Sequence, residues 1–205
     1  MTLLFDFGGV LVDLDKERCI RNFQNLGFDI RPYLGTYVQG GFFAEFERGE
    51  LSVPGFCQKI REISGRNLTD EAIVSAWQSF LLDVPVERLE MLLKIRRHYP
   101  VAVLSNTNVV HWDMARHDYF TYQGRSVADF FDHVFLSCEL GVCKPDSPIF
   151  RAVCDGIGCP AEDILFFDDS EVNCEAARKF GMQARIAPAG GAWLAYFDEE
   201  GRLRE

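Results

Sequence analysis

A short apolar run that ends in carboxylates occurs twice in this chain, and this pattern most constrains the fold. Residues 3–5 are followed by Asp6, and residues 164–167 are followed by Asp168 and Asp169. Continuous apolar runs of this length are typical of buried parallel strands. Open α/β sheets bind ligands at the carboxyl ends of such strands, so we expect the three carboxylates to converge. A Mg²⁺ ion, which takes oxygen ligands, would relieve their mutual repulsion.

Other apolar runs complete a predicted parallel sheet. In the second half of the chain they alternate with helical patterns, which indicates βαβ units with right-handed crossovers. The helical patterns at 148–156 and 172–181 both stop at a glycine, a common C-terminal signal. We therefore predict an α/β fold with a parallel sheet flanked by helices. Its strands are expected at residues 3–7, 101–105, 133–137, 164–168 and 183–187, with a final helix at 193–197.

The segment between the first two predicted strands is far longer than a crossover needs. Its helical patterns lie at residues 16–26, 32–46, 53–63, 70–82 and 86–98. Ser52 and Thr69 precede two of these patterns and are favoured N-caps. We predict that residues 15–84 form a helical cap over the strand ends and that residues 1–14 and 85–205 form the core domain. The alternative is a separate helical domain without a role at the site.

The charge and cysteine content restrict the expected partners. The chain has 205 residues and a formal net charge of −10, with no basic stripe, so we expect neither nucleic acid nor membrane as a partner. Seven cysteines without a CxxC pair indicate reduced, mostly buried thiols; a zinc site at the pairs Cys138/Cys143 and Cys154/Cys159 is the alternative. We recognise no signal peptide and no bilayer-spanning run, and we expect a cytoplasmic monomer or weak homodimer.

Two of the predicted strand ends carry groups suited to ligand binding. Gly8 and Gly9 follow Asp6 closely, and two glycines after a strand let the main chain approach a ligand. Ser105 and Asn106 follow the next strand with hydroxyl, amide and N–H groups that suit an anion. The structural alternatives are a simple turn at the glycines and an ordinary helix cap at the serine and asparagine.

Two further motifs place charges at the same edge. Lys144 precedes Pro145 at a predicted helix start, from which its ammonium could reach a phosphate, although a lone loop lysine is usually solvated. Asp168 and Asp169 adjoin a buried strand, where they would either bind a cation or cap the following helix. Capping accounts for one acid more easily than for both.

Taken in order, the four motifs FDFGGVLVD, VLSNTN, GVCKPD and LFFDDS resemble the haloacid dehalogenase superfamily of hydrolases. The resemblance spans the whole chain, including the helical cap inserted after the first motif. It implies a Rossmann-like core and a phosphatase that uses an aspartate nucleophile. Within the superfamily, the first motif, the cap segment GFFAEFERGELS and the LSNTN run resemble the bacterial α-D-glucose-1-phosphate phosphatase branch.

The resemblance implies a role for each matching residue. Asp6 would attack phosphorus and form an aspartyl-phosphate that water hydrolyses. Mg²⁺ would be held by the Asp6 carboxylate, the Gly8 main-chain carbonyl and Asp168 or Asp169. Lys144 would also keep Asp6 ionised. The phosphoryl oxygens would be held by the Gly8–Gly9 turn and by Ser105, Asn106 and Lys144.

One departure concerns the proton that the leaving group needs. Most phosphatases of the superfamily carry a second aspartate two residues after the nucleophile, where this chain has Gly8. A sugar 1-phosphate, whose anomeric oxygen is less basic than an alkoxide, needs less proton assistance. Alternatively, water, the substrate or a cap residue supplies the proton, or catalysis has been lost. The candidate proton donors are Asp13, Glu45 and Glu47.

The expected substrate is therefore a small phosphorylated metabolite, with α-D-glucose 1-phosphate as the leading candidate. A 2-haloacid dehalogenase is the rival enzyme, although those enzymes need no metal and lack the adjacent acid pair. A non-catalytic phosphate-binding or regulatory domain is the third possibility. Cap residues expected to contact the sugar are Phe42, Phe43, Glu47 and Arg48, which could instead belong to the cap core or to a solvated helix end.

Overall fold

The computed structural model describes residues 1–35 and 39–204. Its centre is a five-stranded sheet in the order β3-β2-β1-β4-β5, in which every neighbouring pair is parallel. The predicted parallel sheet is confirmed, and β2 and β4 have the predicted bounds. The strands are β1 (Thr2–Phe5), β2 (Val101–Ser105), β3 (His133–Leu136), β4 (Ile164–Asp168) and β5 (Gln183–Ile186).

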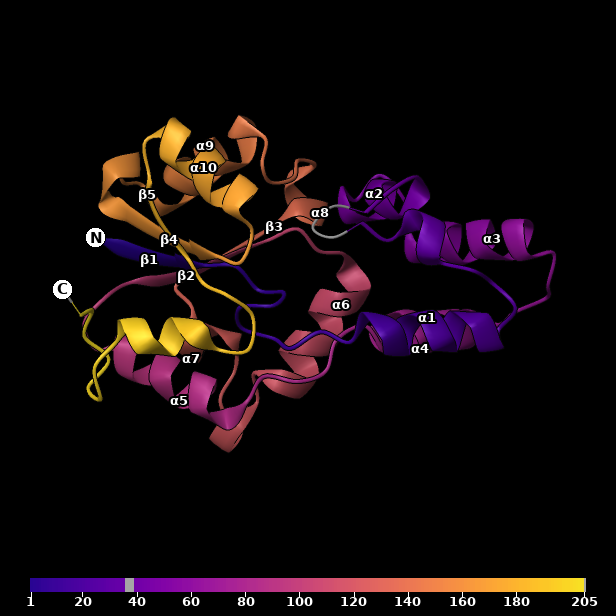
Figure 1. Ribbon diagram of the computed structural model, residues 1–205, viewed down its shortest axis with the longest axis horizontal. Coiled ribbons are helices and arrows are strands. Elements are labelled where there is room, and N and C mark those ends of the chain that lie inside the picture. Colours follow the sequence, from indigo (N-terminus) through magenta and orange to yellow (C-terminus); the bar gives the residue numbers. More distant parts are fainter. Residues whose placement is uncertain (36–38, 205) are drawn as a thin grey trace.

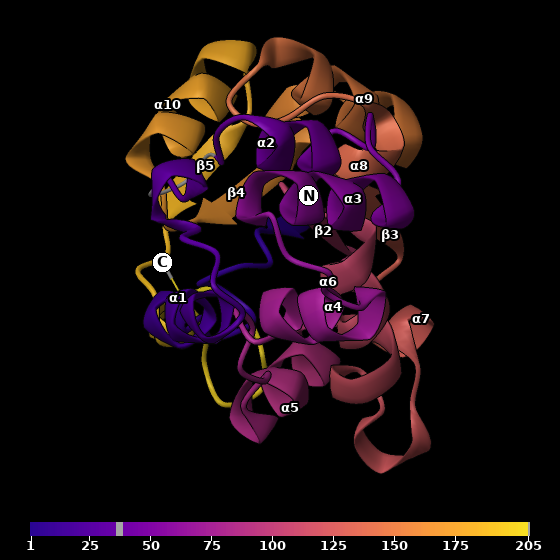
Figure 2. The ribbon, with the colours of Figure 1, turned by 90° about the vertical axis from the view of Figure 1, so that its right-hand side faces the viewer.

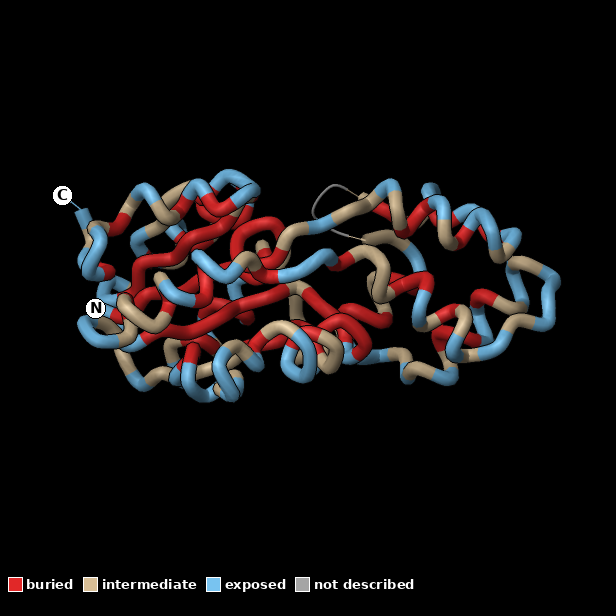
Figure 3. The backbone as a smooth tube through the Cα atoms, turned by 90° about the horizontal axis from the view of Figure 1, so that it is seen from below, coloured by how far each residue is buried: buried red, intermediate tan, exposed pale blue. Residues whose placement is uncertain are grey.

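Helices cover both faces of this sheet (Figure 1). Those of the core domain are α5 (Val86–Ile95), α6 (Val109–Met114), α7 (Val127–Phe130), α8 (Ser137–Leu140), α9 (Ser147–Ile157) and α10 (Glu171–Phe180). Side chains alternate across each strand, so Leu4 packs with α9 and α10 while Leu3 and Phe5 pack with α5 and α7. The strands lie in the buried centre of the chain (Figure 3).

The predicted helical insertion forms a second group of helices beyond the carboxyl ends of the strands (Figures 1 and 2). It contains α1 (Lys16–Asn25), α2 (Phe42–Glu47), α3 (Val53–Ser64) and α4 (Asp70–Gln78). These helices share an aromatic core, in which Phe43 packs edge-on against Phe56 and Trp77. Ser52 and Thr69 cap α3 and α4 as predicted, by accepting hydrogen bonds from main-chain N–H groups.

Three helix predictions require correction. The helix expected at residues 32–46 is absent from the described residues, which show a 3₁₀ turn at Arg31–Tyr33 and the short α2; residues 36–38 lie outside the description. Gly41, with φ of +56°, ends the non-helical stretch. Helix α9 runs through Gly156, which packs tightly against the Phe135 ring, and ends at Gly158. The final helix is a 3₁₀ segment at Ala192–Tyr196.

The packing around Phe5 predicts how much this one aromatic ring contributes to the stability of the fold. Phe5 is fully buried, stacks on Phe167 with 4.8 Å between centroids and contacts Trp193 edge-on at 5.0 Å. Phe5→Ala should lower the free energy of unfolding by about 3–5 kcal/mol. The exposed control Val172→Ala should change it by less than about 0.5 kcal/mol. Urea unfolding of both variants checks this expectation; equal midpoints would contradict it.

Candidate active site

The four sequence motifs meet at the carboxyl edge of the sheet. Asp6 follows β1, Ser105 ends β2 and Asp168 ends β4, while Lys144 comes from the loop that joins α8 to α9. Because β1 lies between β2 and β4, these groups project beside one another. The edge is therefore the place where a parallel α/β sheet is expected to hold a ligand.

The centre of the site is the Lys144 ammonium. Its Nζ donates to Asp6 Oδ1 and to Asp168 Oδ2, both at 2.6 Å, and lies 3.3 Å from the Leu104 carbonyl oxygen. Lys144 and Asp168 are buried, and Asp6 is only 7 % exposed. Burial lowers the pKa of Lys144, but the carboxylates of Asp168 and Asp6 raise it further, so the amine is charged. The alternative of a solvated loop lysine does not apply, because Lys144 is buried.

Asp168 is saturated with hydrogen bonds. In addition to Lys144, its carboxylate accepts from the Ser170 main-chain N–H at 2.8 Å and from Asn173 Nδ2 at 3.0 and 3.2 Å. The cap of α10 is Ser170, whose hydroxyl accepts from the Asn173 N–H. Helix capping therefore accounts for neither Asp168 nor Asp169, contrary to the structural alternative considered from sequence.

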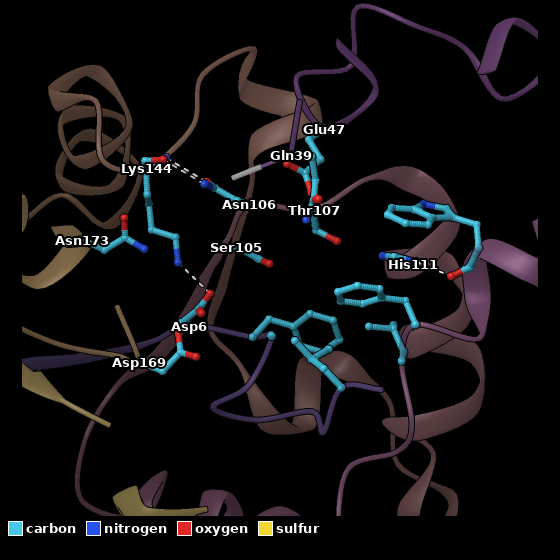
Figure 4. Close-up of a pocket in the computed structure, with 16 residues that line it drawn as sticks. Asp6, Gln39, Glu47, Ser105, Asn106, Thr107, His111, Lys144, Asp169 and Asn173 are labelled. Atoms are coloured by element: carbon cyan, nitrogen blue, oxygen red, sulfur yellow. Dashed lines mark hydrogen bonds and ion pairs between the residues drawn. The ribbon is translucent and has the colours of Figure 1, made fainter. Parts of the chain in front are cut away.

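Asp169 is half-buried and faces the cavity of the site (Figure 4). Burial, followed by the charge of Asp168, raises its pKa to about 6. Gly9 has φ of +82°, and a Cβ at that position would lie 2.7 Å from Asp169 Oδ2. The second glycine of the first motif thus makes room for this carboxylate, because any larger residue would displace it.

The charges of the site fit a divalent cation. The carboxylates of Asp6, Asp168 and Asp169 each offer an oxygen within 4.8 Å of the others, and Lys144 is the ammonium that balances them. Burial raises the pKa of Asp6 to about 7, and only Lys144 opposes this effect, since Asp168 and Asp169 add to it. Clustered oxygen donors with excess negative charge are the donor set that Mg²⁺ prefers.

Ser105 and Asn106 have different surroundings. The Ser105 side chain is buried and points into the cavity (Figure 4). The Asn106 amide instead joins two motifs, because its Nδ2 donates to the Lys144 carbonyl at 2.9 Å and its Oδ1 accepts from the Lys144 N–H at 2.8 Å. Its side chain therefore orients the main chain of the lysine.

The cavity is small and lies between the core and the cap helices. Its volume is about 100 Å³, well below the roughly 300–1,000 Å³ typical of sites for drug-sized ligands. Figure 4 shows the Glu47 and Gln39 side chains facing Asn106 and Thr107 across it. Gly8 also lines the cavity. Apolar groups complete the wall, namely Phe7, Leu14, Trp77, Phe80 and Leu81.

Most cap residues expected to contact the substrate lie elsewhere. Phe42 and Phe43 are buried in the cap core, and Arg48 pairs with the exposed Glu50. Of the four residues named from the sequence, Glu47 is the one that lines the cavity. The alternatives of cap core and solvated helix end therefore hold for the other three.

The other two candidate proton donors lie outside the cavity lining. Asp13 forms a 2.8 Å ion pair with the buried Arg88, and Glu45 is half-buried on α2. Among the described residues, the metal-like cluster is the aspartate group, and the cysteines are free thiols. In the described residues the paired cysteine spacing therefore corresponds to no cluster of metal ligands. The expectation of mostly buried thiols is wrong, because Cys19, Cys57 and Cys174 are buried and the other four are partly exposed.

Sequence reasoning missed several residues that shape the site. Asn173 holds Asp168, and Trp77 and His111 form part of the cavity wall. Ser137 lies at the contact between cap and core, where its Oγ is 2.6 Å from the Glu47 carbonyl oxygen and accepts from the Thr107 N–H at 2.9 Å. Two features of the sequence could have pointed to this region, namely the polar LSNTN run and the position of Asn173 in the first turn of the helix after Asp168. Trp77 and Ser137 show no such feature without the fold.

Comparisons with known proteins agree with this geometry. The family described as haloacid dehalogenase-like hydrolase matches residues 1–181. D-ribitol-5-phosphate phosphatase of Bacteroides thetaiotaomicron is 33% identical over 192 residues, which cover 93% of each chain. No helix in the described part of the chain is long and apolar enough to cross a bilayer.

Solved structures resemble this chain to different degrees. The HAD family enzyme bt-2542 of Bacteroides thetaiotaomicron, in complex with magnesium and inorganic phosphate, has a TM-score of 0.91 at 39% identity, covering 96% of this chain and 98% of that one. The L-2-haloacid dehalogenase PA0810 has a TM-score of 0.60 at 18% identity, covering 100% of this chain and 91% of that one, and so shares the fold alone. The chain belongs to the haloacid dehalogenase-like hydrolases.

Proposed function

We propose that this chain is a Mg²⁺-dependent phosphatase that hydrolyses a small phosphorylated sugar or sugar alcohol through an aspartyl-phosphate. The observation that carries the proposal is the buried Asp6 carboxylate, which is held by Lys144 beside two further carboxylates at the floor of a small cavity. An anchored carboxylate that faces a cavity is a competent nucleophile toward phosphorus. The role of Asp6 as this nucleophile is part of the proposal.

The metal would be held by Asp6, by the Gly8 main-chain carbonyl and by Asp169, with Asp168 as a further oxygen donor. Asp168 already accepts from Lys144, Ser170 and Asn173, which favours Asp169 as the more available ligand. When bound, Mg²⁺ would neutralise repulsion between the nucleophile and the phosphate. The chain's own groups would hold the phosphoryl oxygens through the Gly8–Gly9 turn, Ser105 Oγ, the main chain at Asn106 and Lys144 Nζ.

Two buried polar atoms in the cavity wall support a hydroxylated substrate. Within residues 1–35 and 39–204, Trp77 Nε1 and Gln39 Oε1 have no hydrogen-bond partner, and both residues line the cavity. A buried donor or acceptor without a partner costs about 1–3 kcal/mol. One is a donor and the other an acceptor, and hydroxyl groups of a sugar or polyol would satisfy both once the side chains turn these shielded atoms toward the cavity.

Two substrates represent the proposed class. The similarity to D-ribitol-5-phosphate phosphatase supports a short-chain polyol phosphate, whereas the motif resemblance to another branch supports α-D-glucose 1-phosphate. The 100 Å³ cavity suits the slimmer polyol chain better than a pyranose ring. We therefore place ribitol 5-phosphate first and retain glucose 1-phosphate as the second candidate. The dehalogenase alternative leaves the third carboxylate, Asp169, without a role.

Phosphate release from a panel of pentitol, hexose 1- and hexose 6-phosphates, with Mg²⁺ and with EDTA, tests the proposal. We expect turnover of pentitol 5-phosphates to exceed that of hexose phosphates, and we expect EDTA to abolish all of it. Chloride release from 2-chloropropionate serves as the dehalogenase control. If none of the phosphate esters released phosphate, or if activity remained full in EDTA, the proposed phosphatase function would be contradicted.

The nucleophile is tested by Asp6→Asn. Asparagine preserves the shape but cannot form the acyl-phosphate, so turnover should fall by a factor on the order of 10⁴ or more. Binding of inorganic phosphate in the presence of Mg²⁺, together with an unchanged near-UV circular dichroism spectrum, serves as the control for a folded site. Activity retained in this variant would exclude the covalent route.

The close approach of Gly9 to Asp169 gives a separate test of the metal site. In Gly9→Ala the new methyl would collide with the carboxylate, so Mg²⁺ affinity should fall by roughly 10–100-fold. Gly65→Ala is the matched control, because Gly65 also has positive φ, at +65°, but has open space around its Cβ position. Isothermal titration calorimetry with Mg²⁺ should separate the two variants, and equal affinities would show that Asp169 is not a ligand.

A further inference from the structure

The position of Gly8 leaves the leaving oxygen without the usual neighbouring acid. Besides water and the substrate itself, a residue that faces the cavity is the remaining source of the proton. The ionisable side chains that line it are Asp6, Glu47, His111, Lys144 and Asp169. Three of these form the ionic cluster at the floor, which leaves Glu47 and His111.

The hydrogen bonds of His111 exclude it as the donor. Its Nε2 lies 2.9 Å from the Trp77 carbonyl oxygen, which can only accept, so this nitrogen carries the ring proton. Its Nδ1 lies 3.3 Å from Asn108 Nδ2 and accepts from that amide. Burial lowers the pKa of His111 to about 4, so the ring is neutral. The single ring proton of His111 is therefore donated to the Trp77 carbonyl oxygen of the cap helix α4.

Glu47 is held at the cavity by the contact between cap and core. Its main-chain oxygen lies 2.6 Å from Ser137 Oγ, which also accepts from the Thr107 N–H next to the phosphate-facing loop. Two residues further, a Cβ on Gly49 would lie only 2.0 Å from the Cys138 carbonyl oxygen. The end of α2 is thus packed directly on α8, and the Glu47 side chain, 7 % exposed, is directed into the cavity (Figure 4).

The surroundings of Glu47 keep its carboxyl group protonated. Burial raises its pKa to about 8, and the Gln39 main-chain amide, Arg48 and Lys144 oppose only part of this rise. At neutral pH the group is a carboxylic acid, with a pKa close to the pH at which a general acid works best.

We propose that Glu47 is the general acid that protonates the leaving oxygen. The inference rests on the proposed phosphatase function. As an Asp6 oxygen bonds to phosphorus, the bond from phosphorus to the substrate oxygen breaks, its electron pair stays on that oxygen, and the Glu47 proton is transferred to it. In the second step a water attacks phosphorus, the bond from phosphorus to Asp6 breaks, and the phosphate product keeps the protons of that water, while Glu47 regains its proton from solvent. Asp6 is then ionised again and Glu47 is protonated again.

Leaving groups of different basicity test the proposal. Glu47→Gln keeps the size and a hydrogen-bonding amide but cannot donate the catalytic proton. Its kcat for a polyol phosphate should fall roughly 10²–10⁴-fold. For acetyl phosphate, whose acetate leaves without a proton, it should fall by less than about tenfold. Glu45→Gln, on the same helix but outside the cavity lining, is the matched control and should retain wild-type rates with both substrates.

A pH profile of the wild type gives a test that needs no variant. Because the acid form is required, kcat for the polyol phosphate should decline as the pH rises above about 8, the pKa of Glu47. With acetyl phosphate this decline should be absent. Identical profiles for the two substrates would overturn the assignment, even if Glu47→Gln proved unstable.

The possible outcomes separate this inference from the proposed function. Equal losses with both substrates would mean that Glu47 binds substrate or supports the fold, and unchanged rates would mean that it has no role. Either result overturns the general-acid assignment while leaving the phosphatase intact. A wild-type protein that hydrolyses neither substrate would instead refute the proposed function.

Discussion

The bridge from Asp6 through the Lys144 ammonium to Asp168 is the interaction on which the rest of the site depends. Burying a charge is costly, and removing one partner of a buried pair typically costs about 3–5 kcal/mol. Here one ammonium, 2 % exposed, compensates two carboxylates that arrive from different strands. Asn106 fixes the main chain of the lysine through two hydrogen bonds, so three strand ends are tied together at the place where a phosphate would bind.

The same bridge leaves an excess of negative charge, and this excess gives the two adjacent acids different tasks. Asp168 is fully buried and its oxygens are occupied by Lys144, Ser170 and Asn173. Asp169 faces the cavity beside Gly9 and, in the part of the chain that the structure describes, has no such set of side-chain donors. One acid therefore suits the support of the lysine, and the other suits a cation. Lys144 does not also balance Asp169, because its charge is already shared between Asp6 and Asp168.

Much of the core was predictable because its signals are local. The bounds of β2 and β4 follow from uninterrupted apolar runs, and a parallel sheet necessarily brings their carboxyl ends together. The helix expected at 32–46 is wrong because Gly41, with positive φ, interrupts the apolar periodicity. The helix end expected at Gly156 is wrong because this glycine lies within α9, where it packs on Phe135. Ser137 and Trp77 could not be found from sequence, since each acts through a tertiary contact between cap and core.

A proton donor on the cap would change what the cap does. An acid two residues after the nucleophile belongs to the core and is present whether or not the cap is seated. Glu47 reaches the cavity because α2 packs on α8, where Ser137 contacts its main-chain oxygen and Gly49 allows close approach to Cys138. Proton transfer would then require the same packing that encloses the 100 Å³ cavity. Because position 8 is a glycine, catalysis would then depend on the fit between cap and core. A substrate too bulky for the seated cap would lose its proton donor as well as its binding site.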